Sequence, residues 1–366
     1  MTVTTSAPHP TVSTTADTER AVQLLDRSRA LVRPALTEAV GRLHPWVAEM
    51  AAYSFGWCEA GGAPTAAAAG GKGLRQALAV LGAEAAGAPA RAGVSAAVAV
   101  ELVHTFSLLH DDIMDGDATR RGRPTVWKAY GTGPAVLAGD ALFVLAVETL
   151  ASAPGSHVPA AVRHLATALN DLVSGQADDL LFESRPWTGP EAVRPDEYRA
   201  MAEHKTGALL GCAAALGAVL AGAPAETVTA LDRAGRHLGL AFQVIDDLLG
   251  IWGDPAVTGK PVHADLRRRK KTFPVLAALD TSAADRPLTR LLEGTEDLDD
   301  AAARRAAALI EEAGGRSTAL AEAHRHIAHV HACLDGLPTG PHALPTAPRA
   351  VDDLRALLAF LVRREM

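Results

Sequence analysis

The sequence predicts an all-α protein, and three observations support this prediction. From Thr18 onward, segments of roughly 15 to 25 residues rich in Ala, Leu and Val show the apolar spacing of amphipathic helices. No run of alternating β-branched or aromatic residues, of the kind a β-sheet needs, interrupts them. Short clusters of glycine and proline separate the segments, at 61–64, 87–89, 131–134 and 222–224. We therefore expect packed helices joined by short turns.

The even spread of these breaks favours a single domain over residues 21–366, because no long linker separates two compositional regimes. Residues 1–20 are rich in Thr, Ser, Ala and Pro and lack the basic and apolar regions of a signal peptide. We predict that they form a flexible N-terminal tail. Near the other end, the proline-rich Gly336–Pro348 is predicted to be a surface loop before a last helix, Val351–Arg364.

Composition excludes several classes of protein. Of the 366 residues, 48% are hydrophobic and 21% are charged, which is typical of a soluble globular chain and not of a disordered one. The net charge of -7 argues against a nucleic-acid-binding protein. The longest uncharged segment, Thr206–Ala225, is dominated by Ala and Gly, so it predicts a buried helix and not a membrane span. Three widely spaced cysteines, Cys58, Cys212 and Cys333, favour a cytoplasmic location.

Three aspartates, Asp111, Asp112 and Asp115, form the most informative cluster. On a helix, Asp111 and Asp115 lie one turn apart and share a face, with Asp112 beside them. Three neighbouring carboxylates repel one another unless they are solvated or bind a hard cation such as Mg²⁺. The alternative is a solvated acidic helix end. Apolar residues on both sides indicate an embedded helix and favour the metal; they are Leu108, Leu109, Ile113 and Met114.

A second acidic pair, Asp246 and Asp247, also lies inside an apolar helical segment. Buried carboxylates without a cation or proton to compensate them are costly, so two such groups are hard to explain by structure alone. If the two clusters face each other across a cavity, they would form a cage for several divalent ions.

Short basic clusters supply the charges that would bind a phosphate group held by such ions. Lys72 and Arg75 lie three residues apart at a predicted helix start, where free backbone N–H groups also favour anions. The other clusters lie at 120–125, 205–207, 259–261 and 265–272. Each alone is more often a group of solvated surface residues, but together, in an acidic protein, they indicate two anionic groups bound near metal.

In this order, the motifs resemble those of the trans-isoprenyl diphosphate synthases, also called polyprenyl synthetases. The likeness runs from Lys72 to Lys271. Its elements are Gly-Gly-Lys-x-x-Arg at 70–75, Asp-Asp-x-x-Asp at 111–115 with Arg-Arg-Gly-x-Pro-Thr at 120–125, Gly175-Gln176-x-x-Asp179, Lys205-Thr206-Gly207, Phe242-Gln243-x-x-Asp246-Asp247 and Gly259-Lys260. Asp-Asp-x-x-Asp alone would also fit a class I terpene cyclase, but cyclases bind one diphosphate and lack the first element.

The resemblance implies a single-domain helical bundle around a deep central cavity, usually in a homodimer. It also implies head-to-tail condensation of isopentenyl diphosphate with an allylic diphosphate, namely dimethylallyl, geranyl or farnesyl diphosphate. The implied cofactor is Mg²⁺, at roughly three ions per active site, with Mn²⁺ as a substitute. In this reaction the allylic C–O bond breaks, and metal and fixed cations stabilise the departing diphosphate.

The resemblance also implies a role for each matching residue. Mg²⁺ on the allylic diphosphate would be coordinated by Asp111, Asp112, Asp115 and Asp246, with Asp247 in the same motif. The allylic diphosphate itself would contact Arg120, Lys205 and Lys260. The diphosphate of isopentenyl diphosphate would contact Lys72, Arg75, His104 and Arg121. Thr206 and Gln243 would lie near the allylic cation, with Gln176 and Asp179 as further pocket residues.

Four positions depart from the family pattern. Gly250 stands where the second motif usually has a third aspartate. Gly73 replaces a common arginine, and Gln76 replaces a common proline. His263 occupies a position that is often glycine, so the loop after Lys260 is expected to close differently.

Product length is predicted from the helix that precedes Asp111. Ser107 and Phe106 lie four and five residues earlier, about 6 to 7.5 Å deeper along the helix. The growing chain should pass the small Ser107 and stop at the ring of Phe106. An aromatic residue at that position resembles the geranylgeranyl (C20) type. Phe106 as an ordinary core residue, and products of C10, C15 or beyond C20, are the alternatives.

Two rival functions would also fit parts of this motif set, a class I terpene cyclase and a catalytically silent partner subunit. A class I terpene cyclase would not need Lys72, Arg75 and His104, and a catalytically silent partner subunit should have lost one aspartate cluster. The four histidines at 324, 326, 329 and 331 do not share one helical face, so they predict a solvated helix and not a metal site.

Overall fold

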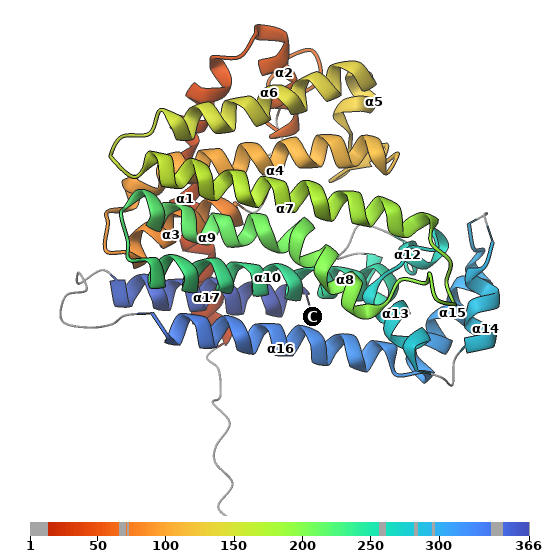
Figure 1. Cartoon of the computed structure of the whole chain (residues 1–366). Helices are drawn as coiled ribbons and strands as arrows, with labels where there is room; N and C mark the ends of the chain where they lie inside the picture. Colours follow the sequence, from red (N-terminus) through yellow and green to blue (C-terminus); the bar gives the residue numbers. More distant parts are fainter. Residues whose placement is uncertain are drawn as a thin grey trace, which may run out of the picture.

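The computed structural model describes residues 14–65, 71, 73–255, 261–281, 285–294, 297–337 and 347–365 (Figure 1). Its first helices are α1 (Thr14–Gly41), α2 (Pro45–Ser54), α3 (Leu74–Ala85), the 3₁₀ turn η1 (Ala90–Gly93), α4 (Val94–Met114), α5 (Val126–Tyr130), α6 (Thr132–Ala151) and α7 (Val158–Ser184). These are followed by α8 (Pro195–Ala202), the π-helical turn η2 (Glu203–Gly207), α9 (Ala208–Leu220) and α10 (Ala225–Trp252). The last are α12 (Ala264–Arg267), α13 (Phe273–Asp280), α14 (Asp285–Leu292), α15 (Asp300–Glu312), α16 (Gly315–Asp335) and α17 (Ala347–Glu365).

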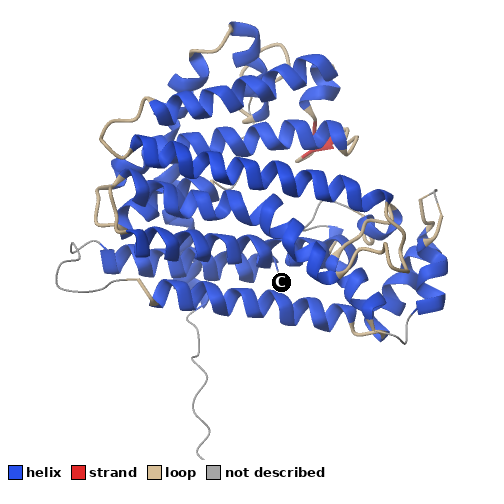
Figure 2. Cartoon of the chain, in the orientation of Figure 1, coloured by secondary structure: helices blue, strands red, loops and turns tan. Residues whose placement is uncertain are grey.

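The predicted all-α fold is confirmed, with one small addition. Two short strands, β1 (Thr119–Arg120) and β2 (Arg123–Pro124), pair antiparallel just after α4 (Figure 2). The two residues between them, Arg121 and Gly122, both have positive φ, 52° and 74°, as in tight hairpin turns. Strands this short carry no alternating pattern, so they could not be predicted from the sequence. The hairpin aims Arg120 and Arg121 back toward α4.

The long helices lie side by side: α6 beside α4, α7 beside α9, α9 beside α10, and α10 beside α16 (Figure 1). Apolar side chains form three buried clusters, and α10 contributes to each of them. Leu238 belongs to the first cluster, Val244 to the second and Ile251 to the third. Because α10 runs through all three, the residues at its end are held firmly in place.

Glycine allows the central helices α3 and α9 to touch backbone to backbone. A Cβ atom on Gly82 would lie 2.1 Å from the carbonyl oxygen of Ala214, and one on Gly217 would lie 2.0 Å from that of Ala79. α9 is almost wholly buried, so the buried helix predicted within Thr206–Ala225 is confirmed. Such close contact fixes α9, and with it the turn η2 that precedes α9.

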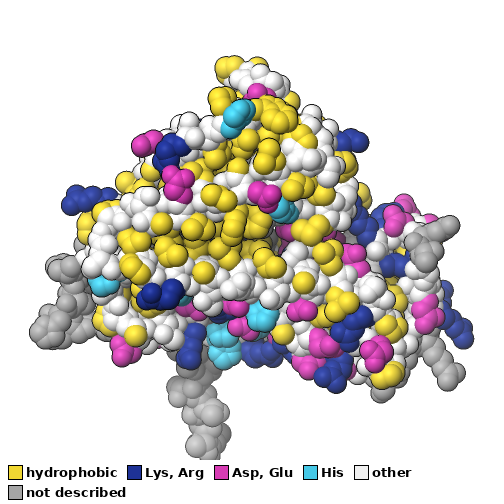
Figure 3. Space-filling model, turned by 45° about the horizontal axis from the view of Figure 1, so that its top comes forward, with side chains coloured by type: hydrophobic (Ala, Val, Ile, Leu, Met, Phe, Trp, Pro, Cys, Tyr) yellow, Lys and Arg dark blue, Asp and Glu magenta, His cyan; other side chains and the backbone are white. Residues whose placement is uncertain are grey.

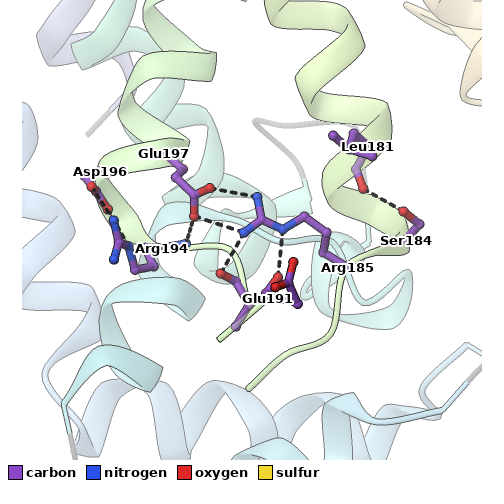
Figure 4. Close-up of polar contacts among 8 residues, drawn as sticks. Leu181, Ser184, Arg185, Glu191, Arg194, Asp196 and Glu197 are labelled. Atoms are coloured by element: carbon purple, nitrogen blue, oxygen red, sulfur yellow. Dashed lines mark hydrogen bonds and ion pairs between the residues drawn. The ribbon is translucent and has the colours of Figure 1, made fainter. Parts of the chain in front are cut away.

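The loop between α7 and α8 is held by Arg185 (Figure 4). Its guanidinium donates to both carboxylate oxygens of Glu197, at 2.8 and 3.2 Å, and to the carbonyl oxygen of Glu191 at 2.7 Å. Glu197 in turn accepts from the backbone N–H of Arg194, which closes the first turn of α8. This network orients α8 and therefore the residues of η2 that follow it.

Two boundaries differ from the sequence prediction. α1 begins at Thr14, so Thr14–Arg20 are helical and not part of a tail. Arg20 explains the difference, because its Nε donates to Asp353 on α17 at 2.7 Å, a contact between the two ends of the chain. α17 begins at Ala347, before the predicted Val351. Residues 1–13 and most of the predicted loop Gly336–Pro348 lie outside the described residues.

The predicted solvated histidine helix is wrong for His326. This residue is only 7% exposed, and its Nε2 lies 3.2 Å from Glu322 while its Nδ1 lies 3.1 Å from Nδ1 of His237 on α10. The ring of His329 stacks on His237. The missing information was the partner on α10, which a helical projection of α16 alone does not reveal.

Glu322, only 2% exposed, gives a prediction for stability. It accepts from Arg199 at 2.7 Å and pairs with Arg325 at 2.6 Å. Burial opposes ionisation, but bonds from His326 and Arg199 outweigh it and lower the pKa of Glu322 to about 2. The stabilisation that ionised Glu322 gives the fold is therefore complete above the ordinary glutamate pKa of 4.5. It is lost as the pH falls toward 2.

We expect Glu322→Gln to lower the free energy of unfolding at pH 7 by about 3 kcal/mol, because two arginines lose their charged partner. Urea denaturation followed by circular dichroism measures this. The difference from wild type should shrink below pH 4.5, and a constant difference down to pH 3 would contradict this account.

Candidate active site

The first aspartate cluster lies at the carboxyl end of α4. Asp112 is 4% exposed, Asp111 is half-buried, and Asp115 is exposed and ends the helix. Burial raises the pKa of Asp111 to about 6, although Lys205 acts in the opposite direction. A helix carboxyl end already carries partial negative charge, so additional carboxylates there call for cations. The three predicted residues are therefore brought together in an environment that favours binding of positive charge.

The β1–β2 hairpin supplies the first of these cations. The guanidinium of Arg120 donates to Oδ1 of Asp112, with Nε at 2.8 Å and Nη2 at 2.7 Å. Arg268, beyond α12, pairs with Asp117 at 3.0 Å just after the cluster. Asp112 is therefore already paired, whereas Asp111 and Asp115 carry no comparable contact among those the structure shows.

The turn η2 brings Lys205 and Thr206 to the same region. Lys205 Nζ donates to Asp179 Oδ2 on α7 at 2.5 Å, and its charge lowers the pKa of Asp111 on α4. A Cβ atom on Gly175 would lie 2.2 Å from the backbone nitrogen of Lys205, so only glycine permits α7 to approach this closely. π-helical turns often mark functional sites. The predicted residues Asp179 and Lys205 are thus adjacent.

Of the second aspartate pair, only Asp246 is exposed. Asp247 is 2% exposed, and its Oδ2 accepts from the hydroxyl of Tyr198 at 2.5 Å and from the backbone N–H of Phe273 at 2.8 Å. Burial raises the pKa of Asp247 to about 7. This carboxyl group joins α10 to α8 and α13, so we assign it a structural role in place of the predicted metal-binding one.

A chain of hydrogen bonds connects Asp247 to the site. Gln243 Nε2 donates to Asp247 Oδ1 at 3.3 Å, and the Gln243 carbonyl accepts from the Thr206 hydroxyl at 2.9 Å. The predicted pair of Thr206 and Gln243 is therefore in direct contact, with its amide orientation fixed from within the core. Gln176 is buried on α7, and in the described part of the chain its Nε2 has no hydrogen-bond partner.

A cationic cavity of about 420 Å³ lies along α4 and reaches the aspartate cluster at Asp112. It is lined by three of the residues predicted to bind isopentenyl diphosphate, Arg75, His104 and Arg121, and also by Asp112 and Arg120. Arg121 also lies against Gly71, whose added Cβ would be 3.2 Å from the guanidinium. Basic groups from α3, α4 and the hairpin therefore converge on one small cavity.

The electrostatics of this cavity favour an anion. Burial lowers the pKa of Arg75 to about 10, and Arg121 adds to the shift. Among the described residues, the Nε of Arg75 has no hydrogen-bond partner. Burial and the neighbouring arginines also hold the pKa of His104 well below its usual value. Glu101, one turn before His104 on α4, opposes the shift at Arg75. A diphosphate would relieve this repulsion.

Lys270 is a residue that sequence reasoning left unassigned within its basic run. Burial acts to lower its pKa, but Asp265, Asp179, Asp247 and Asp115 outweigh burial and raise it. These carboxylates come from α12, α7, α10 and the end of α4, so both aspartate clusters act on one lysine. The sequence signal was weak because Lys270 is one of several adjacent basic residues.

Four predicted residues are not placed in this geometry. Lys72 and Lys260 lie outside the described residues. Phe106 does not line the cationic cavity, because its ring packs between α4 and α6 against Phe143 and His110, with centroids 5.5 and 5.1 Å away. Ser107 donates its hydroxyl proton to the carbonyl oxygen of His104 at 2.9 Å. Phe143 was not anticipated, because it lies 37 positions later in sequence.

Comparison with known proteins is consistent with this geometry. The family model described as Polyprenyl synthetase matches residues 63–312. The chain is 46% identical over 314 residues to a (2E,6E)-farnesyl diphosphate synthase of Mycobacterium tuberculosis, covering 85% of this chain and 86% of that one. It is 45% identical over 344 residues to a geranylgeranyl diphosphate synthase of the same organism, covering 93% of each.

Among solved structures, the polyprenyl synthetase from Streptomyces coelicolor A3(2) is 46% identical, with a TM-score of 0.85, and the match covers 93% of this chain and 99% of that one. The all-α architecture is therefore that of the polyprenyl synthases. The match also excludes an unrelated helical bundle that shares only the aspartate motif. The chain belongs to the polyprenyl synthetase family and is a trans-prenyltransferase that extends prenyl chains head to tail.

Proposed function

We propose that the protein condenses isopentenyl diphosphate with an allylic diphosphate in a Mg²⁺-dependent reaction that gives geranylgeranyl diphosphate (C20) and releases diphosphate. The observation that supports this most is the layout of α4. This helix carries His104 in the cationic cavity and, two turns later, Asp111 in the carboxylate cluster. Because residues seven apart share one face of a helix, isopentenyl diphosphate and the allylic diphosphate could therefore be held one after the other along the same face of α4.

The carboxylate cluster fits a divalent cation. Asp111 is a buried carboxylate with a raised pKa at a helix carboxyl end, where a cation would stabilise its charge. Within the described ranges, no three His, Cys, Asp or Glu side chains converge tightly enough to hold a metal by themselves. Mg²⁺ usually keeps waters and binds substrate phosphates through one or two carboxylates, so this arrangement suits it. Asp111, Asp115 and Asp246 would hold the ions, which neutralise the leaving diphosphate.

The remaining residues position the reactants. Arg75, Arg121 and His104, with Lys72, would fix the isopentenyl diphosphate so that its double bond faces the allylic carbon. Lys205, Arg120 and Lys260 would bind the allylic diphosphate and stabilise the charge that develops as the C–O bond breaks. Thr206 and Gln243 would direct their oxygen dipoles at the allylic cation that forms when the C–O bond breaks. The apolar faces of α4, α9 and α10 would keep water from quenching it.

Product length is proposed to depend on Phe106. The two mycobacterial relatives are named for C15 and C20 products at nearly equal identity, so likeness alone does not decide between them. Phe106 packs against Phe143, and together they form an aromatic barrier between α4 and α6, on the same helix as Asp111. A barrier one and a half turns below the diphosphate favours C20 over longer products.

We expect Phe106→Ala to shift the main product beyond C20, because removing the ring opens the space in front of Phe143. Mass spectrometry of the dephosphorylated products measures the shift. Phe55→Ala is a matched control, because this ring lies in the cationic cavity and should leave product length unchanged. An unchanged C20 product from Phe106→Ala would make Phe106 an ordinary core residue.

A homodimer is proposed from the outer faces of α6 and α7. Exposed apolar side chains follow one face of each helix, and Figure 3 shows hydrophobic groups gathered in a broad band. They are Val136, Leu137, Phe143 and Val144 on α6 and Val173, Leu180 and Leu181 on α7. By length and composition alone, the stretches Ala90–Met114 and Thr132–Ala151 could each cross a membrane. We propose that a second copy of the chain, and not lipid, covers this face.

We expect Val144→Glu to convert the dimer to a monomer, because Val144 is 61% exposed at the centre of the α6 face and a buried charge there would oppose association. Light scattering after size-exclusion chromatography measures the mass. Val22→Glu on α1, 41% exposed and outside this face, is the control. A dimer that survives Val144→Glu would place the interface elsewhere.

A cytoplasmic location is proposed from the cysteines. Cys58, Cys212 and Cys333 are all unpaired, and Cys58 and Cys212 are buried. Burial raises the pKa of each of the three thiols, so none is activated.

The proposed reaction is tested by its stoichiometry. With Mg²⁺ and farnesyl diphosphate, each isopentenyl diphosphate consumed should release one diphosphate, and chelation of Mg²⁺ by EDTA should stop both. Release of diphosphate without consumption of isopentenyl diphosphate would indicate the cyclase instead. Absence of both, with every primer, would indicate the silent subunit.

A further inference from the structure

Gly250 and Asp265 are in direct contact at the end of α10. A Cβ atom added to Gly250 would lie 2.0 Å from Oδ2 of Asp265 and 2.5 Å from its Cγ. The carboxylate of Asp265, on α12, therefore occupies the space that a side chain at position 250 would fill. Gly250 lies four residues after Asp246, so the two share one face of α10. The carboxylate thus lies one helical turn beyond Asp246.

His263 brings α12 to this position. It has a left-handed backbone, with φ of 62°, and caps the start of α12. Its backbone N–H donates to the carbonyl oxygen of Ile251 at 3.2 Å, and its Nδ1 lies 2.6 Å from the same oxygen. Ile251, which follows Gly250, is thereby hydrogen-bonded to His263, which lies two residues before Asp265. Gly250 leaves space for the Asp265 carboxylate, and His263 holds α12 where that carboxylate fills the space.

The charge of Asp265 acts on the same region as the carboxylates of α4. It raises the pKa of Lys270, as Asp179 and Asp115 do. Asp265 also helps to raise the pKa of Arg268, which pairs with Asp117 just after α4. Asp265 therefore belongs electrostatically to the end of the site that would hold divalent cations.

We infer that Asp265 supplies, from α12, the second carboxylate of the α10 half of the cation site, next to Asp246, and that Gly250 is required to leave room for it. This inference rests on the proposed function, because it assigns one more residue to the site that would bind metal and diphosphate. Asp265 is a binding residue in this account. Gly250 and His263 are positioning residues that act through it.

The test measures Mn²⁺ binding to the full-length protein by electron paramagnetic resonance, in the presence of inorganic diphosphate. We expect Asp265→Asn to weaken Mn²⁺ binding by about tenfold. Gly250→Ala should weaken it similarly, because its methyl group displaces the carboxylate without removing it. The double variant Gly250→Asp with Asp265→Gly should bind like wild type, since it moves the carboxylate from α12 to α10.

Asp300→Asn is the matched control. Asp300 is an exposed carboxylate, and its partner Arg267 lies on α12, the short helix that also carries Asp265. It should bind Mn²⁺ normally. Circular dichroism melting identifies any variant that fails to fold, and the double variant gives an independent reading. Wild-type binding in Asp265→Asn, or no recovery in a folded double variant, would overturn the assignment alone. Wild-type protein that binds no Mn²⁺ with diphosphate would overturn the proposed function as well.

Discussion

Replacing Asp111 with asparagine should lower the turnover number by about 10²- to 10³-fold. Asp111 is half-buried at the end of α4, and its carboxylate lies within the electrostatic influence of Lys205, Arg120 and Asp179. Asparagine keeps the shape but loses the charge that would hold a cation on the leaving diphosphate. The rate of incorporation of radiolabelled isopentenyl diphosphate at saturating Mg²⁺ and substrates measures the effect.

The loss should come from chemistry and not from unfolding. Burial raises the pKa of Asp111, which means that its ionised form is costly in the folded protein without a cation. The melting temperature of Asp111→Asn in metal-free buffer should therefore equal or exceed that of wild type. Asp196→Asn on α8, an exposed site, is the control and should retain full turnover. Wild-type turnover in Asp111→Asn would remove this residue from the catalytic machinery.

Replacing Arg75 with glutamine should raise KM for isopentenyl diphosphate by about 10- to 100-fold, the value of one or two charge-assisted hydrogen bonds. Arg75 lines the 420 Å³ cavity with His104 and Arg121, and its Nε lacks a partner. KM for farnesyl diphosphate should change much less, because that substrate is assigned to the carboxylate cluster at the end of α4. Steady-state kinetics with each substrate varied in turn separate the two effects.

Arg91→Gln, an exposed arginine on η1, is the control for general loss of positive charge. Equal increases of both KM values in Arg75→Gln would show that the cavity does not discriminate between the two diphosphates. An unchanged KM for isopentenyl diphosphate would place its diphosphate elsewhere.

The sequence predicted the α4 half of the site well, because spacing along one helix determines which side chains share a face. Asp111 and Asp115 are one turn apart, and the structure places both at the end of α4. The cationic cavity was also predicted in its composition, since Arg75, His104 and Arg121 line it together. The aspartate prediction needed only local periodicity, whereas the residues of the cavity were predicted from the resemblance to the polyprenyl synthetases.

The second half was predicted less well, because it depends on contacts between helices. Asp246 and Asp247 are neighbours in sequence, and only the position of Tyr198 decides that Asp247 faces the core. The contact of Gly250 with Asp265 joins α10 to α12, and no periodicity links those positions. The early start of α1 depends likewise on Asp353 of α17, at the far end of the chain.

The measurement that tests the central claim most directly is product analysis of the wild-type protein. It would be incubated with Mg²⁺, isopentenyl diphosphate and, separately, dimethylallyl, geranyl or farnesyl diphosphate, and the dephosphorylated products identified by mass spectrometry. The proposed function predicts a linear C20 alcohol from each primer. A linear alcohol of another length would keep the reaction and contradict the role of Phe106. A cyclic hydrocarbon, or no consumption of isopentenyl diphosphate with any primer, would contradict the proposed function itself.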